Sequence, residues 1–229
     1  MSLESFHYAC RLLTPKARRL KEFKDTTQLF IFTLDLITRK FPIITAVDGL
    51  PHDTISIYPC DPSLGGVIIV TANSLIYVDQ ASRKTLLPVN GWAQRVSDMQ
   101  PQTLRDDELE RNLCLEGSVV GFVDERTFFI VLHDGTVYPV DIIMEGRIVS
   151  RLAMGSALAH TTIPSVISVI NVDSRRYLFV GSTVGPSVLL KSTKVQEEIP
   201  QDLETETVTA AVAETSMNIE LDDDEGGPM

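Results

Sequence analysis

The chain has 229 residues, of which 44% are hydrophobic and 22% charged, so it can bury a sizeable core in one or two domains. Its formal net charge of −11 sits at one end: residues 195–229 hold 11 of the 31 acidic residues and no lysine or arginine. Residues 1–194 are therefore neutral overall, which argues against a broad nucleic-acid surface there. No run of about 18 apolar residues and no signal-peptide core is present, so we expect neither a membrane helix nor secretion.

The beginning of the chain, residues 1–27, gathers basic side chains around a few apolar ones. Pro15 interrupts any helix before Lys16, so an amphipathic helix here would be short. Such a cluster can contact RNA phosphates, which require cations and little else, but a solvated helix face or an ill-ordered lead-in is the simpler interpretation. We expect no ordered domain in this segment. The basic residues are Arg11, Lys16, Arg18, Arg19, Lys21 and Lys24.

Residues 64–80 predict a β-hairpin. Gly65 and Gly66 allow the backbone to enter the first strand with no side chain in the way. Val67 to Val70 is a continuous, β-branched apolar run, which is typical of a strand buried on both faces. Within Ala72-Asn73-Ser74, Asn73 can adopt the left-handed conformation that a tight turn needs.

The same strand-turn-strand unit returns twice. Residues 126–132 and 136–142 flank His133-Asp134-Gly135, and Asp-Gly between apolar runs is the strongest short-range hairpin signal. Residues 176–181 and 186–191 flank the third turn. Further strands are expected at residues 28–34, 41–47, 54–58, 85–89, 118–123, 147–154 and 165–170.

These strands predict an all-β fold. Hairpins recurring irregularly at roughly fifty residues, with strands between them, are typical of divergent β-propeller blades. A β-sandwich of the same strands is the alternative, although sandwiches usually space their strands evenly by about 8–12 residues. We therefore predict a partial β-propeller of about three blades of antiparallel strands over residues 28–194, followed by an acidic disordered segment.

That acidic segment, residues 195–229, contains no aromatic residue and few large apolar ones. It cannot bury enough apolar surface to offset the entropy of ordering, so we expect a disordered tail or insertion. A solvated spacer is the simplest role, and a docking segment for a basic partner is the functional alternative. The cluster at 222–225 lacks the ligand spacing of a calcium-binding EF-hand loop.

The sequence offers no catalytic constellation. Its cysteines and histidines are scattered, without a disulfide framework, a paired-cysteine zinc motif, a Gly-x-Ser-x-Gly nucleophile motif or a phosphate-binding loop. We therefore predict no enzyme and assign no catalytic, cofactor-binding or metal-binding residue, with His133 exposed in its turn. The scattered residues are Cys10, Cys60 and Cys114, and His7, His52, His133 and His160.

Several short motifs, in collinear order over residues 29–194, resemble one family. A Pro-x-x-Gly-Gly-Val run stands at 62–67, and Asn-Ser-Leu, a tyrosine and a polar pair follow at 73–80. Residues 177–191 match Tyr-Leu-Phe-x-Gly-Ser-x-x-Gly-x-Ser-x-Leu-Leu-Lys in all of the named positions. The other pieces are Phe32-Thr33-Leu34-Asp35-Leu36, Leu50-Pro51-His52-Asp53, Leu87-Pro88-Val89-Asn90 and Leu132-His133-Asp134-Gly135-Thr136.

These motifs resemble the large subunit of the cleavage and polyadenylation specificity factor. The resemblance implies a nuclear, non-catalytic scaffold of three propellers, of which this chain supplies later blades of the first. It implies WD-repeat and zinc-finger subunits as partners, with pre-mRNA reached through the complex rather than directly, no cofactor and no membrane. The alternative is a relative with the same architecture, namely the ubiquitin-ligase adaptor that binds UV-damaged DNA or a splicing-factor subunit.

The number of blades has a physical consequence. A propeller hides its strand edges by closing the ring, whereas a few blades alone leave two edges open and part of the core uncovered. We therefore expect this chain by itself to be marginally stable or prone to aggregation.

Overall fold

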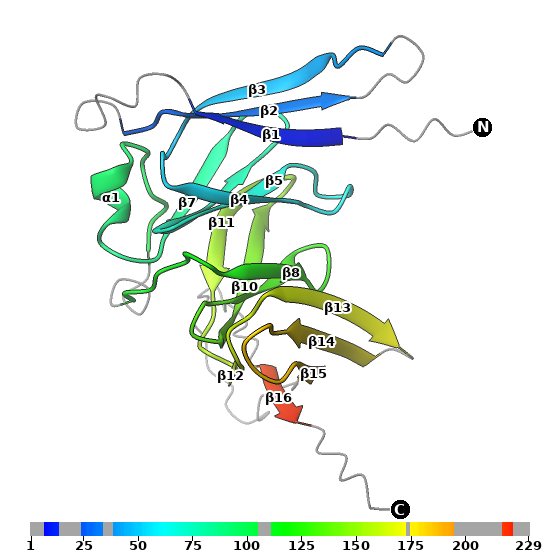
Figure 1. Cartoon of the computed structure of the whole chain (residues 1–229). Helices are drawn as coiled ribbons and strands as arrows, with labels where there is room; N and C mark the ends of the chain where they lie inside the picture. Colours follow the sequence, from blue (N-terminus) through cyan, green and yellow to red (C-terminus); the bar gives the residue numbers. More distant parts are fainter. Residues whose placement is uncertain are drawn as a thin grey trace, which may run out of the picture.

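The computed structural model describes residues 7–13, 24–33, 39–104, 111–172, 175–194 and 217–221. These residues form four antiparallel β-sheets and one short helix, and the sheets follow one another in chain order along the molecule (Figure 1). The predicted all-β class is confirmed. In this part of the chain, no helix has both the length and the apolar character needed to cross a membrane.

The strands within each sheet are consecutive in sequence, as in the meanders of propeller blades. The first sheet consists of β1 (His7–Leu13), β2 (Thr27–Thr33) and β3 (Ile43–Leu50). The second consists of β4 (Thr54–Pro59), β5 (Val67–Thr71), β6 (Ser74–Val78) and β7 (Lys84–Pro88), after which comes α1 (Ala93–Val96).

The third sheet consists of β8 (Val119–Phe122), β9 (Thr127–Val131), β10 (Thr136–Glu145) and β11 (Ile148–Met154), with the short β12 (Ala159–His160) beside β10. The fourth consists of β13 (Val166–Val172), β14 (Arg175–Gly181), β15 (Val188–Lys194) and β16 (Met217–Leu221). Three successive four-stranded meanders and an open end fit the predicted partial propeller.

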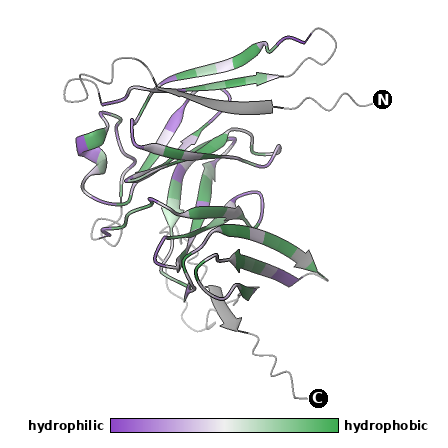
Figure 2. Ribbon diagram, viewed as in Figure 1, coloured by the Kyte–Doolittle hydropathy of each residue, from purple (hydrophilic) through white to green (hydrophobic). Residues whose placement is uncertain are grey.

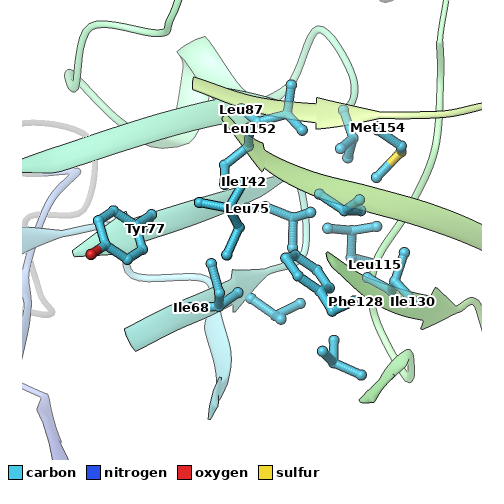
Figure 3. Close-up of a cluster of buried hydrophobic side chains, with 14 of the residues drawn as sticks. Ile68, Leu75, Tyr77, Leu87, Leu115, Phe128, Ile130, Ile142, Leu152 and Met154 are labelled. Carbon is cyan, nitrogen blue, oxygen red and sulfur yellow. The ribbon is translucent and has the colours of Figure 1, made fainter. Parts of the chain in front are cut away.

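Three apolar layers hold the sheets together. The largest lies between the second and third sheets and includes Ile68, Leu75, Phe128 and Leu152, all fully buried (Figure 3). A second layer joins the first and second sheets, and a third joins the third and fourth. Each fully buried side chain of this size contributes about 1.5–3 kcal/mol, so the cores between sheets dominate the stability.

Strand β5 shows why the sheets must stack. Its five residues are all buried, with Ile68 in the layer toward the third sheet and Ile69 in the layer toward the first. The expectation of a strand buried on both faces is therefore confirmed. A sheet covered on both faces by two other sheets is the geometry of an internal propeller blade rather than of a two-sheet sandwich.

All three predicted hairpins are present, as β5–β6, β9–β10 and β14–β15. Each further strand expected between them also forms, with ends displaced by at most a few residues. The sequence did not indicate α1 or β12, which are too short to carry a periodic pattern.

The structure differs from the expected absence of order at both ends of the chain. β1 lies within residues 1–27 and pairs with β2, and β16 lies within residues 195–229 and pairs with β15. The physical reason is the same at both places, because an edge strand leaves backbone N–H and C=O groups unpaired until another segment joins it. β15 and β16, which are neighbours in the sheet, are therefore far apart in the sequence. Apart from these strands, both end segments are described only for residues 24–26.

Candidate interaction surfaces

Three polar residues from separate motifs meet at one end of the second sheet. The Asn73 side-chain amide donates to Asp53 Oδ2 over 2.7 Å, and Asn90 Nδ2 donates to Asn73 Oδ1 over 3.0 Å. Asn90 also donates to the Leu113 carbonyl, in the connection that leads to β8. These motif residues therefore tie together the β3–β4 turn, the β5–β6 turn and the segment after β7.

The turn between β5 and β6 does not use a left-handed asparagine. Among the described non-glycine residues only Arg39 and Ser82 have a positive φ, so the expectation for Asn73 is wrong. Thr71 Oγ1 instead accepts hydrogen bonds from the backbone N–H groups of Asn73 (3.1 Å) and Ser74 (2.8 Å). The threonine closes the turn, which leaves the Asn73 side chain available to reach Asp53.

Other motif residues also act on the backbone. Gly66 has φ +77°, and a Cβ there would lie 2.4 Å from the Val78 carbonyl oxygen, which confirms that this entry to β5 excludes a side chain. Ser182 Oγ accepts hydrogen bonds from the N–H groups of Val184 (3.2 Å) and Gly185 (3.1 Å). Gly66 and Ser182 therefore act on the shape of their turns.

Among the described side chains, the histidines and cysteines form no cluster of three or more potential metal ligands. Nowhere in the described ranges do three His, Cys, Asp or Glu side chains gather as metal ligands would. His133 is exposed in its turn, as expected, and His160 Nδ1 lies 3.3 Å from Thr136 Oγ1. His52 Nδ1 lies 3.2 Å from the Lys24 carbonyl oxygen. The side chains of His7 and Cys10 lie outside the described set.

A hollow of about 470 Å³ opens where the second, third and fourth sheets meet. Cys60 lines it, but burial, and then the charge of Asp61, raise the pKa of this thiol to about 12, so it stays protonated. Burial also raises the pKa of nearby Tyr77 to about 12, and the Tyr77 hydroxyl donates to the Gly65 carbonyl over 3.1 Å. The hollow therefore offers no thiolate nucleophile.

The carboxylate of this hollow is already engaged. Asp124 accepts hydrogen bonds from the N–H groups of Arg126 (3.0 Å) and Thr127 (2.8 Å), and from Arg176 Nη1 (3.0 Å) of the fourth sheet. Burial by itself raises the pKa of Asp124, but these hydrogen bonds outweigh it and hold the pKa below its ordinary value. Asp124 thus fixes the β8–β9 turn and links two sheets.

A second hollow, of about 600 Å³, lies between the segment leading to β8 and the β9–β10 turn. Cys114 and His133 line it, and both are exposed. The lining of this hollow differs from that of the first, since its cysteine and histidine are both accessible.

The outer face of the fourth sheet carries several exposed apolar side chains. Inner-face residues such as Leu178 and Leu190 are buried against the third sheet, whereas the outer face is open and β13 is largely hydrophobic along its length (Figure 2). Leu189 is 51% exposed and pairs across the strands with Phe179. We call this surface the outer face; it comprises Val166, Ile170, Val172, Tyr177, Phe179 and Leu189.

Sequence reasoning missed this surface. A signal was present, because residues 166–172 place apolar residues in both alternating sets of positions, with only Ser168 and Asn171 polar, a pattern typical of a strand covered on both faces. The first sheet has a similar surface near the start of β3, where Phe41 and Ile43 are 60% and 61% exposed. Contiguous exposed apolar area is typical of surfaces that contact another structural unit.

Comparison with known proteins adds an independent finding. The family described as RSE1/DDB1/CPSF1 first beta-propeller matches residues 16–219. The protein named cft1 of Neurospora crassa is 30% identical over 178 residues, which are 76% of this chain and 12% of that relative. The protein named CFT1 of Yarrowia lipolytica is 29% identical over 170 residues, covering 73% of this chain and 13% of the relative.

The protein named cft1 of Schizosaccharomyces pombe is 29% identical over 189 residues, which are 78% of this chain and 13% of that relative. The chain therefore spans only a small part of the length of the curated relatives that it matches.

Proposed function

Because the chain belongs to the RSE1/DDB1/CPSF1 first beta-propeller family, we propose that it is part of a non-catalytic scaffold subunit of the pre-mRNA 3′-end cleavage and polyadenylation complex. The observation that carries this proposal is the match to proteins named Cft1 over about three quarters of the chain. Several residues of the motifs that resemble the polyadenylation factor, among them Asn73, Asn90 and Ser182, form hydrogen bonds that hold turns and connections of the sheets, which supports a structural role.

A scaffold role agrees with the chemistry of the described residues. The buried thiol of Cys60 is protonated, the carboxylate of Asp124 is engaged, and no group of metal ligands forms among them. The accessible features are turns and apolar faces, which bind and position other proteins. The proposal accordingly places the chain in the nucleus without a cofactor.

We assign the outer face to another blade of the same longer protein. The matched relatives are several times longer than this chain, which covers 12–13% of their length. A neighbouring blade would bury Leu189, Phe179 and Ile170 in the way that the third sheet buries Leu178 and Leu190 on the opposite face. Burial of these side chains stabilises the ring by the same hydrophobic effect that holds the described sheets together.

The proposed partners are the WD-repeat and zinc-finger subunits that recognise the polyadenylation signal. Pre-mRNA is reached through that complex, because residues 1–194 carry equal numbers of basic and acidic residues and offer no cationic excess for phosphates. The alternative is a splicing or ubiquitin-ligase adaptor, since the family description names RSE1 and DDB1 beside CPSF1. The relatives named Cft1 favour the polyadenylation role.

The test is to tag the protein at its own locus, purify it from nuclei, and identify its mass and companions by mass spectrometry. A product much heavier than 25.3 kDa, accompanied by poly(A) polymerase and the cleavage endonuclease, is the expected result. Spliceosomal or cullin companions would instead support the alternative. A 25.3 kDa product with none of these companions would contradict both roles.

A further inference from the structure

The single tryptophan of the chain is displayed on the surface. Trp92 lies just before α1, in the connection between the second and third sheets, and 57% of its surface is accessible. An indole exposed to this extent costs hydrophobic free energy in the unbound protein. Tryptophan is among the residues most enriched at the energetic centres of protein–protein interfaces.

Hydrogen bonds hold the beginning of the turn that carries Trp92. The backbone N–H of Trp92 donates to Asn90 Oδ1 over 2.9 Å, and Asn90 is itself held by Asn73 and by the Leu113 carbonyl. The Trp92 carbonyl then accepts from the N–H of Arg95 over 2.8 Å. The network of motif residues thus fixes the backbone from which the indole projects.

Hydrogen bonds and an ion pair hold the end of the turn to the segment before β2. Ser97 Oγ and the N–H of Asp98 donate to the two carboxylate oxygens of Asp25, over 2.7 and 2.9 Å. Lys24 Nζ pairs with Asp98 at 2.8 Å and donates to the Gln94 carbonyl over 3.2 Å. A side chain presented on a backbone held at both ends loses little further entropy on binding.

Arg95 completes the patch. Its guanidinium carbon lies 4.6 Å from the centre of the Trp92 ring, a cation–π arrangement that holds the two exposed side chains together. No carboxylate in the described part of the chain pairs with Arg95, while the neighbouring Lys24 is neutralised by Asp98. Within the described ranges, the patch therefore presents an aromatic surface beside a positive charge that forms no ion pair.

We propose that the Trp92–Arg95 patch is a docking site for a partner protein that presents a carboxylate next to an apolar side chain. The carboxylate pairs with Arg95 and the apolar side chain packs on the indole. A single-stranded nucleic acid is the less suitable occupant, because it needs a groove of several cations beside the aromatic ring. The inference is independent of which complex contains the protein.

The experiment replaces Trp92 with the photoreactive residue p-benzoylphenylalanine in the tagged, full-length protein in cells. After irradiation, purified cross-links are digested and sequenced by mass spectrometry. The expected product is one recurrent peptide of another protein, with Asp or Glu within a few residues of an apolar cross-linked position. The same photoreactive residue at Val184, which is 73% exposed and carries no stacked cation, serves as the control.

Charge reversal then tests the pairing. Arg95→Glu is expected to lower the yield of the position-92 cross-link at least tenfold, while Arg95→Lys retains most of it. Cross-links to RNA, yields no higher than at Val184, or a yield unchanged by Arg95→Glu would each overturn the proposal. Because Arg95 is an exposed side chain, the Arg95→Glu protein is expected to fold normally. Circular dichroism and protease resistance of this variant check that it does.

Discussion

The amide of Asn73 and the carboxylate of Asp53 form a 2.7 Å hydrogen bond between two turns that are 20 residues apart in the chain. The other carboxylate oxygen, Asp53 Oδ1, is buried and has no hydrogen-bond partner among the described residues. Within these residues, the carboxylate therefore depends on the hydrogen bond that Asn73 donates to Oδ2. The same asparagine accepts from Asn90, whose other hydrogen bonds position Leu113 and Trp92. One side chain thereby couples the second sheet to the patch at α1.

Asn73→Ala removes both hydrogen bonds, including the one that the Asp53 carboxylate accepts within the described part of the chain. We expect the free energy of unfolding, measured by urea denaturation, to fall by about 1–3 kcal/mol, the usual cost of an unsatisfied buried polar group. Asn112→Ala, at an exposed position, is the matched control and should change it by less than about 0.5 kcal/mol. Equal effects of the two substitutions would show that the network contributes nothing.

Substitutions at Gly135 and Gly146 distinguish the cost of a left-handed backbone conformation from the cost of a steric clash. Both have positive φ, +91° and +64°, but a Cβ at Gly135 would lie 1.9 Å from the Thr161 carbonyl oxygen, whereas one at Gly146 meets nothing within 4 Å. Gly146→Ala should therefore cost about 1–2 kcal/mol, the left-handed penalty alone. Gly135→Ala should cost more than about 3 kcal/mol. Similar unfolding midpoints for the two variants would contradict this account.

Cys60 and Cys114 should differ in reactivity. A thiol with a pKa of about 12 is ionised in about one molecule in 10⁴ at pH 8, and Cys60 is also buried, whereas Cys114 is exposed. Iodoacetamide at pH 8 should modify Cys114 at least tenfold faster, as measured from the separate peptides by mass spectrometry. In urea the two rates should converge; equal rates in the folded protein would refute the burial of Cys60.

The same burial predicts alkaline destabilisation. In the folded protein the pKa values of Cys60 and Tyr77 are about 12, raised from ordinary values of 9.0 and 10.0. As the pH rises, the unfolded chain therefore loses these protons at a lower pH than the folded protein does. The stabilisation is complete below about pH 9 and is lost as the pH rises toward about 12. The unfolding midpoint should decline in that window, and Cys60→Ala should reduce the decline. A midpoint independent of pH from 9 to 11 would contradict the prediction.

The outer face predicts the behaviour of the chain by itself. Leu189→Lys combined with Ile170→Lys should raise the monomer fraction in size-exclusion chromatography with light scattering, because both side chains are exposed on an uncovered apolar face. Val184→Lys, in an exposed turn outside this face, should leave that fraction unchanged. A sharp two-state melt of a monodisperse unmodified monomer would refute the expected marginal stability.

The positions of most strands could be predicted because their signals are local. The Gly65-Gly66 entry, the apolar run of β5 and the Asp134-Gly135 turn each specify backbone conformation within a few residues. The error at Asn73 shows the limit of such reasoning. The residue type indicated a turn, but Thr71 made the turn and the asparagine bonded across 20 residues.

The amino-acid sequence by itself determined the strand content, the hairpins and the family, since these depend on neighbouring residues and on motif order. Only the tertiary structure decided that β1 and β16 join sheet edges, that Asp53, Asn73 and Asn90 meet, and that Leu189 faces outward while Leu190 faces the core. The physical reason is that partners distant in the chain are set by strand register and by the stacking of sheets. A one-residue shift of register would exchange the two faces of β15.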